Sequence, residues 1–279
     1  TGTTLTINHG AVIKFPPGET LVVDGTLNAQ GTSSDKVYFT SLRDNSVGGV
    51  TGNSTTSTPN IADWGYIENE SMASGTLDNA VVRYGGSSNQ EIYLLGGVFD
   101  ISNSQISSSS EMNIDVEGGT LNIVSSEINN ATYGIFMASG TINVSSTYFH
   151  NNSSHAIYNL TDVTSSAYAE NNYWDSPSGP YNLNLNPNGT GDAVSDYVDF
   201  SPWLLNPPTS TKESIQFDGA SGLGYNASQD EFAATDPFTI EFDTYNDGQG
   251  NESPILFLTY MDKDGNSQQG EVDFAKGDN

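Results

Sequence analysis

The chain of 279 residues carries 34 acidic residues against seven basic ones, has a formal net charge of −27 and contains no Cys. Such a charge argues against nucleic acid and anionic membrane surfaces as partners, because both are bound through clustered Lys and Arg. Without Cys there are no disulfides or thiolate-bound metals. No apolar run approaches the roughly 18 residues that cross a bilayer, so the sequence predicts no membrane insertion in this segment. An acidic surface suited to cation-rich water, or specific metal sites, would account for the charge.

Residues 1–42 alternate short apolar runs with turn signals. The runs are LTI, AVIKF, TLVVDGTL and KVYFT, and HG, PPG, DG and SSD provide the turns. This pattern predicts short strands in the opening coils of an all-β protein. Lys14 and Lys36 stand singly beside the runs and are predicted to be surface residues.

Residues 43–63 interrupt this pattern with a segment rich in Gly, Ser, Thr and Asn. A loop of this length within a compact domain is often functional. It therefore either carries a binding surface or simply decorates the fold. The motif DWGYI restarts the strands at Asp63. Trp64 is predicted to cap or fill the stack near this loop, whereas an exposed Trp64 would favour sugar binding.

An internal repeat spans residues 75–174. The segments GTLDNAVVRY, GVFDISNSQI, GTLNIVSSEI and GTINVSSTYF begin at Gly75, Gly97, Gly119 and Gly140, in steps of 22, 22 and 21 residues. Apolar and polar columns alternate, as in strands with one buried face. Three columns are predicted to point inward: Leu77, Phe99, Leu121 and Ile142; Tyr84, Ile106, Ile128 and Phe149; Ile92, Ile114, Ile135 and Ile157. Each repeat thus holds three short strands, and stacked copies predict a parallel β-helix, a type of solenoid.

Polar residues repeat with the same period. One outward column consists of Asp78, Asp100, Asn122 and Asn143. Because it continues as Asn, it predicts a ladder of hydrogen-bonded side chains rather than a catalytic carboxylate pair. In the turns, Asn130, Asn151 and Asn171 recur, and Asn tolerates the left-handed conformation.

The segment from Glu170 closes the repeat with the motif NNYW and with several prolines. We predict that it lays an irregular cover on the last coil and hides the open strand edge from other chains. The residues of this cover are Tyr173, Trp174, Tyr181 and Trp203, with Pro177, Pro180 and Pro202.

These motifs resemble a known family. NNYW followed by SGP and VDFSPWL, and the opening LTINHGAVIKFPPGETLVVDGTLNAQGT with DWGYI and LDNAVVRYGG, are similar to segments of the pectin-lyase-like superfamily. Asp175 stands where that family usually has Gly. The resemblance covers residues 3–205 and implies a right-handed parallel β-helix that is secreted or exposed at the cell surface.

Residues 206–213 are predicted to be a linker, and residues 214–279 a small antiparallel β module, because IQF, FTIEFDTY, ILFLTYMD and GEVDF alternate without the repeat period. SGLGYNAS and PFTIEFDTYNDGQGNES resemble part of an L-type, legume-lectin-like lectin. That resemblance implies a calcium site, with Phe257 in place of the usual His. Calcium suits this set of carboxylates and one carbonyl, although they also fit ordinary acidic strand residues. The implied ligands are Glu241, Asp243, Tyr245, Asp247 and Glu252.

Ten Asn-X-Ser/Thr sequons offer glycosylation sites if the producing cell modifies exported proteins. Many would also arise by chance in a chain so rich in Asn and Ser. They are Asn53, Asn69, Asn130, Asn143, Asn151, Asn152, Asn159, Asn188, Asn226 and Asn251.

Bases for catalysis are few. A lyase needs a basic residue and usually calcium, and a hydrolase needs paired carboxylates. Arg43 and Arg83 stand alone, and His9, His150 and His155 are scattered, although the last two flank one turn. The sequence therefore favours a non-catalytic role over an enzyme.

The predicted function is that of an extracellular or cell-surface structural or adhesive protein. A rigid β-helix rod would associate with itself or with neighbouring domains, and would display a module that binds a polysaccharide or surface glycan. The alternative is a carbohydrate-active enzyme, either a polysaccharide lyase or a glycoside hydrolase.

Overall fold

The computed structural model describes residues 2–51, 57–160, 166–208, 255–261 and 267–273. The chain divides into two compact units, Thr1–Glu213 and Ser214–Asn279. All regular elements in the described ranges are β-strands. None of these residues forms a helix that is long and apolar enough to cross a membrane.

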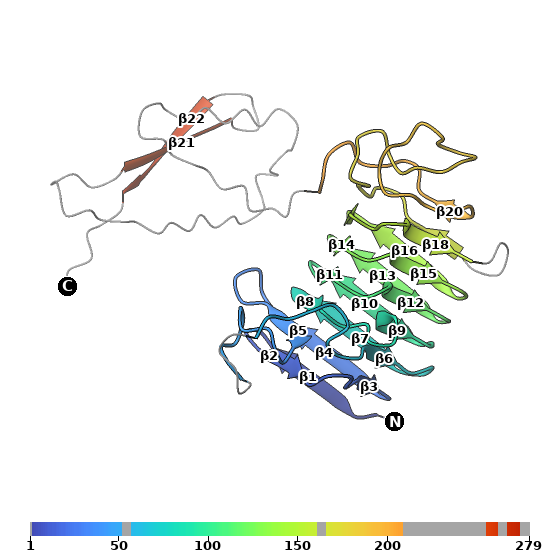
Figure 1. Ribbon diagram of the computed structural model, residues 1–279. Helices are drawn as coiled ribbons and strands as arrows, with labels where there is room; N and C mark the ends of the chain where they lie inside the picture. The colour runs from blue at the N-terminus through green and yellow to red at the C-terminus, as the bar shows by residue number, and fades with distance from the viewer. Residues whose placement is uncertain (1, 52–56, 161–165, 209–254, 262–266, 274–279) are drawn as a thin grey trace, which may run out of the picture. The chain divides into compact units, whose positions relative to one another are not determined.

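The first unit is a solenoid of three parallel sheets (Figure 1). Sheet A contains β1 (Thr4–Asn8), β4 (Thr26–Gln30), β7 (Ser74–Asp78), β10 (Val98–Ser102), β13 (Thr120–Val124), β16 (Thr141–Ser145), β19 (Ser166–Tyr168) and β20 (Val198–Asp199). Sheet B contains β2 (Val12–Phe15), β5 (Val37–Ser41), β8 (Ala80–Arg83), β11 (Gln105–Ser107), β14 (Glu127–Asn129) and β17 (Tyr148–His150). Sheet C contains β3 (Leu21–Val23), β6 (Ile67–Asn69), β9 (Gln90–Leu94), β12 (Met112–Val116), β15 (Tyr133–Met137) and β18 (His155–Asn159).

From β1 to β18, each coil gives one strand to sheet A, the next to sheet B and the third to sheet C, so neighbours within a sheet are three strands apart in the chain, except for the final pair β19 and β20. This arrangement is the parallel β-helix predicted from the repeat. A single coil leaves its apolar face open, and only the coils above and below cover it. The fold class is therefore confirmed for this unit.

Inward side chains form continuous columns. Ile92, Ile114, Ile135 and Ile157 pair in register across sheet C and are fully buried. Burying each such side chain contributes about 1.5–3 kcal/mol. The β-branched residues suit the pleated surface as well as the core. The column predicted for sheet C is confirmed.

The first repeat has a different register from the one predicted. Leu77 pairs with Ile101, and Asp78 pairs with Ser102, so β7 is offset by two residues. Gly75 is not the turn glycine of its coil. It faces inward on β7, where a Cβ would overlap the ring of Phe99. The missing side chain makes room for that ring, and Asp78 consequently leaves the column that holds Asp100.

The same offset corrects a second column. Val82, not Tyr84, pairs with Ile106 in sheet B. Tyr84 follows the end of β8 and has a positive φ of 67°. The remainder of the column, with Ile128 and Phe149, is as predicted.

The turn residues behave as their types indicate. Asn130, Asn151 and Asn171 have φ values of 56°, 57° and 59°. This is the left-handed region, which Asn adopts at lower energetic cost than most residues. Asn172 then ties adjacent coils, because its Nδ2 donates to Val144 O over 2.8 Å and its Oδ1 accepts from Thr147 N over 2.9 Å.

The segment after β19 extends all three sheets. In sheet A it adds β20. Isolated bridges join Tyr173 to Tyr148 at the end of sheet B and Val194 to Ile157 at the end of sheet C. Each sheet therefore meets backbone from the closing segment.

Aromatic residues fill the space beneath this segment. Trp174 is fully buried, and its ring stacks on Phe149 with 4.9 Å between centroids. Trp203 Nε1 donates to Pro177 O over 3.2 Å. Tyr181 differs from the others because 42% of it is exposed. The predicted cover of the last coil is present, with Trp174 at its centre.

A second aromatic contact lies directly after the loop of residues 43–63. Trp64 is fully buried, stacks on Phe15 with 4.4 Å between centroids and donates from Nε1 to Arg83 O over 2.9 Å. The prediction that Trp64 fills the stack is confirmed, and its burial leaves no ring face for a sugar.

The second unit is described only by an antiparallel pair, β21 (Ile255–Met261) and β22 (Ser267–Asp273). The predicted calcium ligands Glu241, Asp243, Tyr245, Asp247 and Glu252 lie outside the described residues.

Candidate functional site

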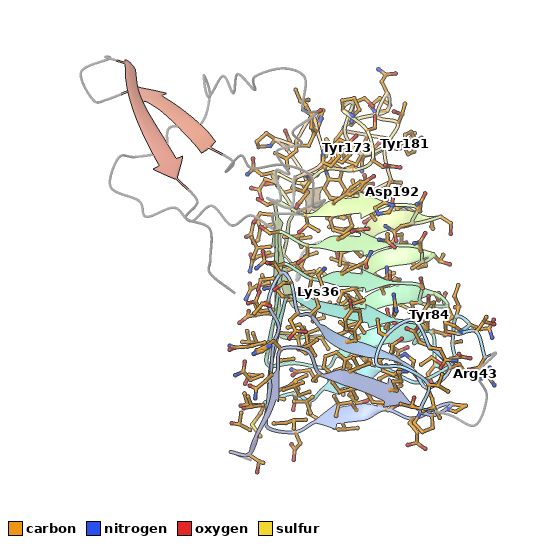
Figure 2. The ribbon with its side chains drawn as sticks, turned by 90° about the vertical axis from the view of Figure 1, so that its left-hand side faces the viewer. Lys36, Arg43, Tyr84, Tyr173, Tyr181 and Asp192 are labelled. Atoms are coloured by element: carbon orange, nitrogen blue, oxygen red, sulfur yellow. The ribbon has the colours of Figure 1, made fainter. Side chains whose placement is uncertain are left out.

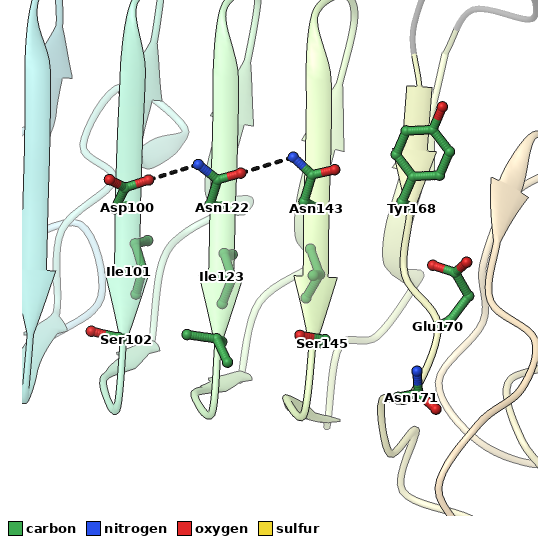
Figure 3. Close-up of a pocket in the computed structure, with 12 residues that line it drawn as sticks. Asp100, Ile101, Ser102, Asn122, Ile123, Asn143, Ser145, Tyr168, Glu170 and Asn171 are labelled. Carbon is green, nitrogen blue, oxygen red and sulfur yellow. Dashed lines mark hydrogen bonds between the residues drawn. The ribbon is translucent and has the colours of Figure 1, made fainter.

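A groove of about 530 Å³ runs across the outer face of sheet A, over β10, β13, β16 and β19. Figure 3 shows four of its side chains, Asp100, Asn122, Asn143 and Tyr168, in a row along the solenoid axis. It is lined by Asp100, Ile101, Ser102, Asn122, Ile123, Val124, Asn143, Val144, Ser145, Tyr168, Glu170 and Asn171.

The row in the groove follows from strand register. Asp100 pairs with Asn122, Asn122 with Asn143, and Asn143 with Tyr168. Their neighbours in sequence point into the core, as the burial of Ile101 shows. Because side chains alternate along a strand, these four residues point outward together.

Hydrogen bonds connect the first three residues (Figure 3). Asn143 Nδ2 donates to Asn122 Oδ1 over 2.8 Å, and Asn122 Nδ2 donates to Asp100 Oδ1 over 2.7 Å. The predicted ladder is thus confirmed for these residues, and Asp78, the fourth expected member, lies elsewhere. A carboxamide has two N–H donors and two acceptor lone pairs. The ladder uses one N–H donor of each Asn. The second N–H of Asn122 and of Asn143, and further oxygen lone pairs of Asp100, can therefore form hydrogen bonds with a ligand.

Tyr168 supplies a different surface at the end of the row. It is 48% exposed and follows Asn143 in the outward column. Val124 is 44% exposed and lies on the neighbouring wall of the groove. A flat ring and an apolar side chain beside a row of amides can bind a ligand that has both apolar faces and hydroxyl edges.

The two arginines that were weighed as bases, Arg43 and Arg83, are both held in ion pairs. Arg43 Nη1 lies 3.0 Å from Asp63 Oδ1, and Arg83 Nη2 lies 2.6 Å from Asp44 Oδ2. Asp44 and Asp63 are buried. Burial raises the pKa of Asp44, but hydrogen bonds from Ser46, Thr40 and Arg83 outweigh it and hold that pKa below its usual value. Both pairs anchor the loop and leave neither guanidinium free to act as a base.

A second polar cluster lies at the end of sheet B. His150 Nε2 lies 2.8 Å from Glu127 Oε1, which also accepts from Gln105 Nε2 over 3.1 Å. The bond from His150 lowers the pKa of Glu127, against the opposing effect of burial. Tyr148 stacks on His150 with 4.3 Å between ring centroids and donates to Asp175 Oδ1 over 2.6 Å.

The protonation state of this cluster is set by its own contacts. Burial, and then the bond to Asp175, raise the pKa of Tyr148 well above its usual value. Asp192 lies at the same end of the solenoid as Tyr173 (Figure 2), and its pKa is raised by burial despite two hydrogen bonds from Asn152. The polar groups therefore pair mainly with one another.

The histidines do not converge. His9 lies 2.8 Å from Asp35 on the exposed surface. His155 lies on sheet C, where its Nδ1 is 2.8 Å from Ser154 Oγ and its ring stacks on Tyr133. Burial lowers the pKa of His155. In the described ranges no three His, Asp or Glu residues are placed to hold a metal ion.

The sequons fall into three groups. Asn69, Asn152 and Asn159 are buried, and their side-chain nitrogens donate to backbone carbonyls of Gly96, Ile128 and Tyr197. A glycan does not fit at these three positions in the folded chain. Exposed sequons in the described chain are Asn130, Asn143, Asn151 and Asn188. Outside the described residues lie Asn53, Asn226 and Asn251.

Sequence reasoning did not find Tyr168 or Glu170. The step from Asn143 to its partner Tyr168 is 25 residues, longer than the preceding steps, so the column is lost in a sequence alignment by eye. The alternation Ala167-Tyr168-Ala169, with Tyr between two small apolar residues, was the sequence signal that could have indicated an outward Tyr168.

Comparisons with known proteins add no family to this description. No family model matches the chain, and no curated protein or solved structure matches it significantly.

Proposed function

We propose that this protein is a non-catalytic, extracellular or cell-surface structural and adhesive protein that binds a polysaccharide or surface glycan along the groove of sheet A. The observation that carries the proposal is the row of Asp100, Asn122, Asn143 and Tyr168. Amide and carboxylate groups pair with sugar hydroxyls, and a Tyr ring packs on the apolar face of a sugar. Because the row follows the solenoid axis, it suits a linear glycan better than a single sugar.

The experiment is a glycan-binding panel with matched tyrosine variants. Tyr168→Ala is expected to lower glycan affinity about tenfold, since stacking and burial of the ring are lost. Tyr181→Ala removes a tyrosine of similar exposure outside the groove and should leave affinity unchanged. Glycan binding that is insensitive to both Tyr168→Ala and Asn122→Ala would refute the groove as the site.

The proposal extends to the lectin-like tail. There, calcium would be held by Glu241, Asp243, Tyr245, Asp247 and Glu252, the ligand types that calcium prefers. Running the panel with and without calcium separates the two sites. Binding that needs calcium and survives Tyr168→Ala belongs to the tail.

A second candidate function, a polysaccharide lyase or glycoside hydrolase, is favoured by the cluster of Glu127, His150, Tyr148 and Asp175. Polysaccharides incubated with the protein are assayed for unsaturated products and new reducing ends. We expect neither, because Glu127 and His150 already pair with each other. Turnover that disappears in Glu127→Gln would replace the non-catalytic proposal.

Self-association forms the last part of the proposal. Within the described residues, β1, β2 and β3 each lie at the edge of a sheet, and an edge strand offers unpaired N–H and C=O groups to another chain. Light scattering over a range of protein concentrations tests this. A monomer at every concentration, with and without calcium, argues against a fibre or matrix.

A further inference from the structure

The outer face of sheet C carries a second column of side chains, which shares no residue with the groove on sheet A. Glu68, Tyr93, Asp115, Phe136 and Tyr158 pair successively across β6, β9, β12, β15 and β18. The residues that flank each of them along the strand are buried, so the column itself points outward. Three of its members are aromatic and two are acidic.

More rings lie beside this column. Tyr133 lies 5.6 Å from both Phe136 and Tyr158, and Phe136 stacks on Tyr158 at 5.5 Å, all measured between ring centroids. Tyr66 meets Tyr93 edge to face at 5.9 Å. We call this surface the aromatic strip; it consists of Tyr66, Glu68, Tyr93, Asp115, Tyr133, Phe136 and Tyr158.

Asp115 lies at the centre of the strip, in register between Tyr93 and Phe136. It is 7% exposed, and its Oδ1 accepts no hydrogen bond from the described chain. Burial, followed by the charges of Glu117 and Glu111, raises its pKa to about 7. A buried carboxyl without a partner is unfavourable unless another group satisfies it.

Among the described residues, no Lys or Arg lies in the strands that form this face. Within the described ranges the Lys and Arg side chains are Lys14, Lys36, Arg43 and Arg83, all in or next to strands β2, β5 and β8 of sheet B. The six strands of sheet C contain none. His155, which stacks on Tyr133, is a weak candidate because burial lowers its pKa. As far as the structure describes the chain, the strip thus combines rings and acids without a Lys or Arg side chain.

We propose that the aromatic strip docks a basic polypeptide segment of a partner protein, with a Lys or Arg side chain placed beside Asp115 and against the rings of Tyr93 and Phe136. Carboxylates attract such a side chain by charge, and aromatic rings attract it through their negative faces. The net charge of −27 favours approach of a basic partner.

Other occupants fit less well. A metal ion needs several convergent ligands, and the described residues offer no group of three His, Asp or Glu here. A neutral sugar would stack on the rings but would leave the charge of Asp115 uncompensated. This inference is independent of the groove on sheet A, because the two surfaces share no residue.

Calorimetric titration with hexalysine tests the proposal, with Asp115→Asn as the variant and Asp100→Asn as the matched control. The titration is run at pH 8.5, above the pKa of Asp115 of about 7, so that both variants remove one negative charge, but only Asp115 lies in the strip. At physiological salt, hexalysine is expected to bind the wild type, and Asp115→Asn should weaken binding tenfold or more. Asp100→Asn should change affinity less than twofold. Fully acetylated hexalysine, which lacks the charges, should not bind.

Two further variants separate a specific site from general charge attraction. Asp115→Glu keeps the charge and should retain most of the affinity, whereas Phe136→Leu keeps an apolar side chain without a ring and should lose affinity. Circular dichroism and urea unfolding check that each variant is folded. Equal losses in Asp115→Asn and Asp100→Asn, or no binding to the wild type, would overturn the proposal. Neutral oligosaccharide binding that depends on Asp115 would also overturn it, in favour of a glycan surface.

Discussion

The outer faces of sheets A and C belong to the same coils, yet their chemistry differs. On sheet A, Asp100, Asn122 and Asn143 are hydrogen-bonded to one another in a ladder along the axis. On sheet C, Asp115 has an unpaired oxygen among aromatic rings. Both faces share one apolar interior, so the inward columns define the fold while the outward columns are free to differ. A solenoid can therefore carry two unlike surfaces on one scaffold.

The largest effect is expected from removing one buried ring of the interior that both outer faces share. Phe99 is fully buried and its ring fills the space above Gly75. Phe99→Ala is expected to lower the free energy of unfolding by about 4 kcal/mol, through lost burial and the cavity left behind. Urea unfolding measures this, with Val98→Ala at the exposed neighbouring position as the control. A loss below about 1 kcal/mol would mean that the coils repack around the gap.

The second prediction concerns Glu91, a buried carboxyl on a strand of sheet C. It is fully buried on β9, and its Oε1 accepts from Gly85 N over 2.8 Å. Burial raises its pKa from 4.5 to about 8. The folded state then holds the proton more tightly than the unfolded state, so stability falls as pH rises from about 4.5 to about 8.

Glu91→Gln should remove this pH dependence, since an amide does not ionise. We expect the free energy of unfolding of the variant to be about 3 kcal/mol higher than that of the wild type at pH 8.5, and equal to it near pH 4.5. Each unit by which folding shifts a pKa is worth at most about 1.4 kcal/mol, and relaxation of the structure around the charge reduces this value. Urea unfolding at both pH values makes the comparison. The idea fails if the wild type is as stable at pH 8.5 as at pH 4.5.

Asp115→Asn sharpens the contrast between the two outer faces. The pKa of Asp115, raised from 3.8 to about 7, predicts a stability loss over that pH interval. The variant should be more stable than the wild type by about 2 kcal/mol at pH 8. Asp100→Asn, on the exposed row of sheet A, should change stability by less than about 0.5 kcal/mol. Thermal unfolding at pH 4 and pH 8 distinguishes the two, and equal effects would contradict the distinction.

Asn122, in the middle of the ladder, should have a smaller effect on stability than Phe99, Glu91 or Asp115. Asn122→Ala removes the acceptor of Asn143 and the donor to Asp100. Unfolding free energy should fall by only about 1 kcal/mol, because water replaces these bonds at an accessible site. The free energy of glycan binding should change by more than this value, because the substitution interrupts the row in the middle. Asn188→Ala, at an exposed Asn outside the groove, is the control. Unchanged glycan affinity in Asn122→Ala would remove the ladder from the binding site.

The sequence predicted those parts of the fold that repeat with constant spacing. Ile92, Ile114, Ile135 and Ile157 were assigned to one inward column, and the structure pairs them in that register. The register at Gly75 was not predictable. A Gly that begins a repeat and a Gly that makes room for a ring look alike in sequence, and the deciding group, Phe99, belongs to the next coil.

The candidate sites follow the same rule: only features that repeat with a constant period were predicted from the sequence. The ladder of Asp100, Asn122 and Asn143 was predicted because polar residues recur there with a constant period. Tyr168 was missed because the period changes before it. The aromatic strip was missed because its rings do not occupy every coil, since Asp115 stands between Tyr93 and Phe136.

The ladder also gives the solenoid a chemical direction. Both hydrogen bonds of the ladder run the same way, from Asn143 to Asn122 and from Asn122 to Asp100, so the amide dipoles add and end at a carboxylate. At the other end the row meets the ring of Tyr168. A chain molecule laid along this row faces an anion at one end and an aromatic ring at the other. Its two orientations are therefore unequal in energy, and a rod that holds polymers in this way would align them with a common polarity.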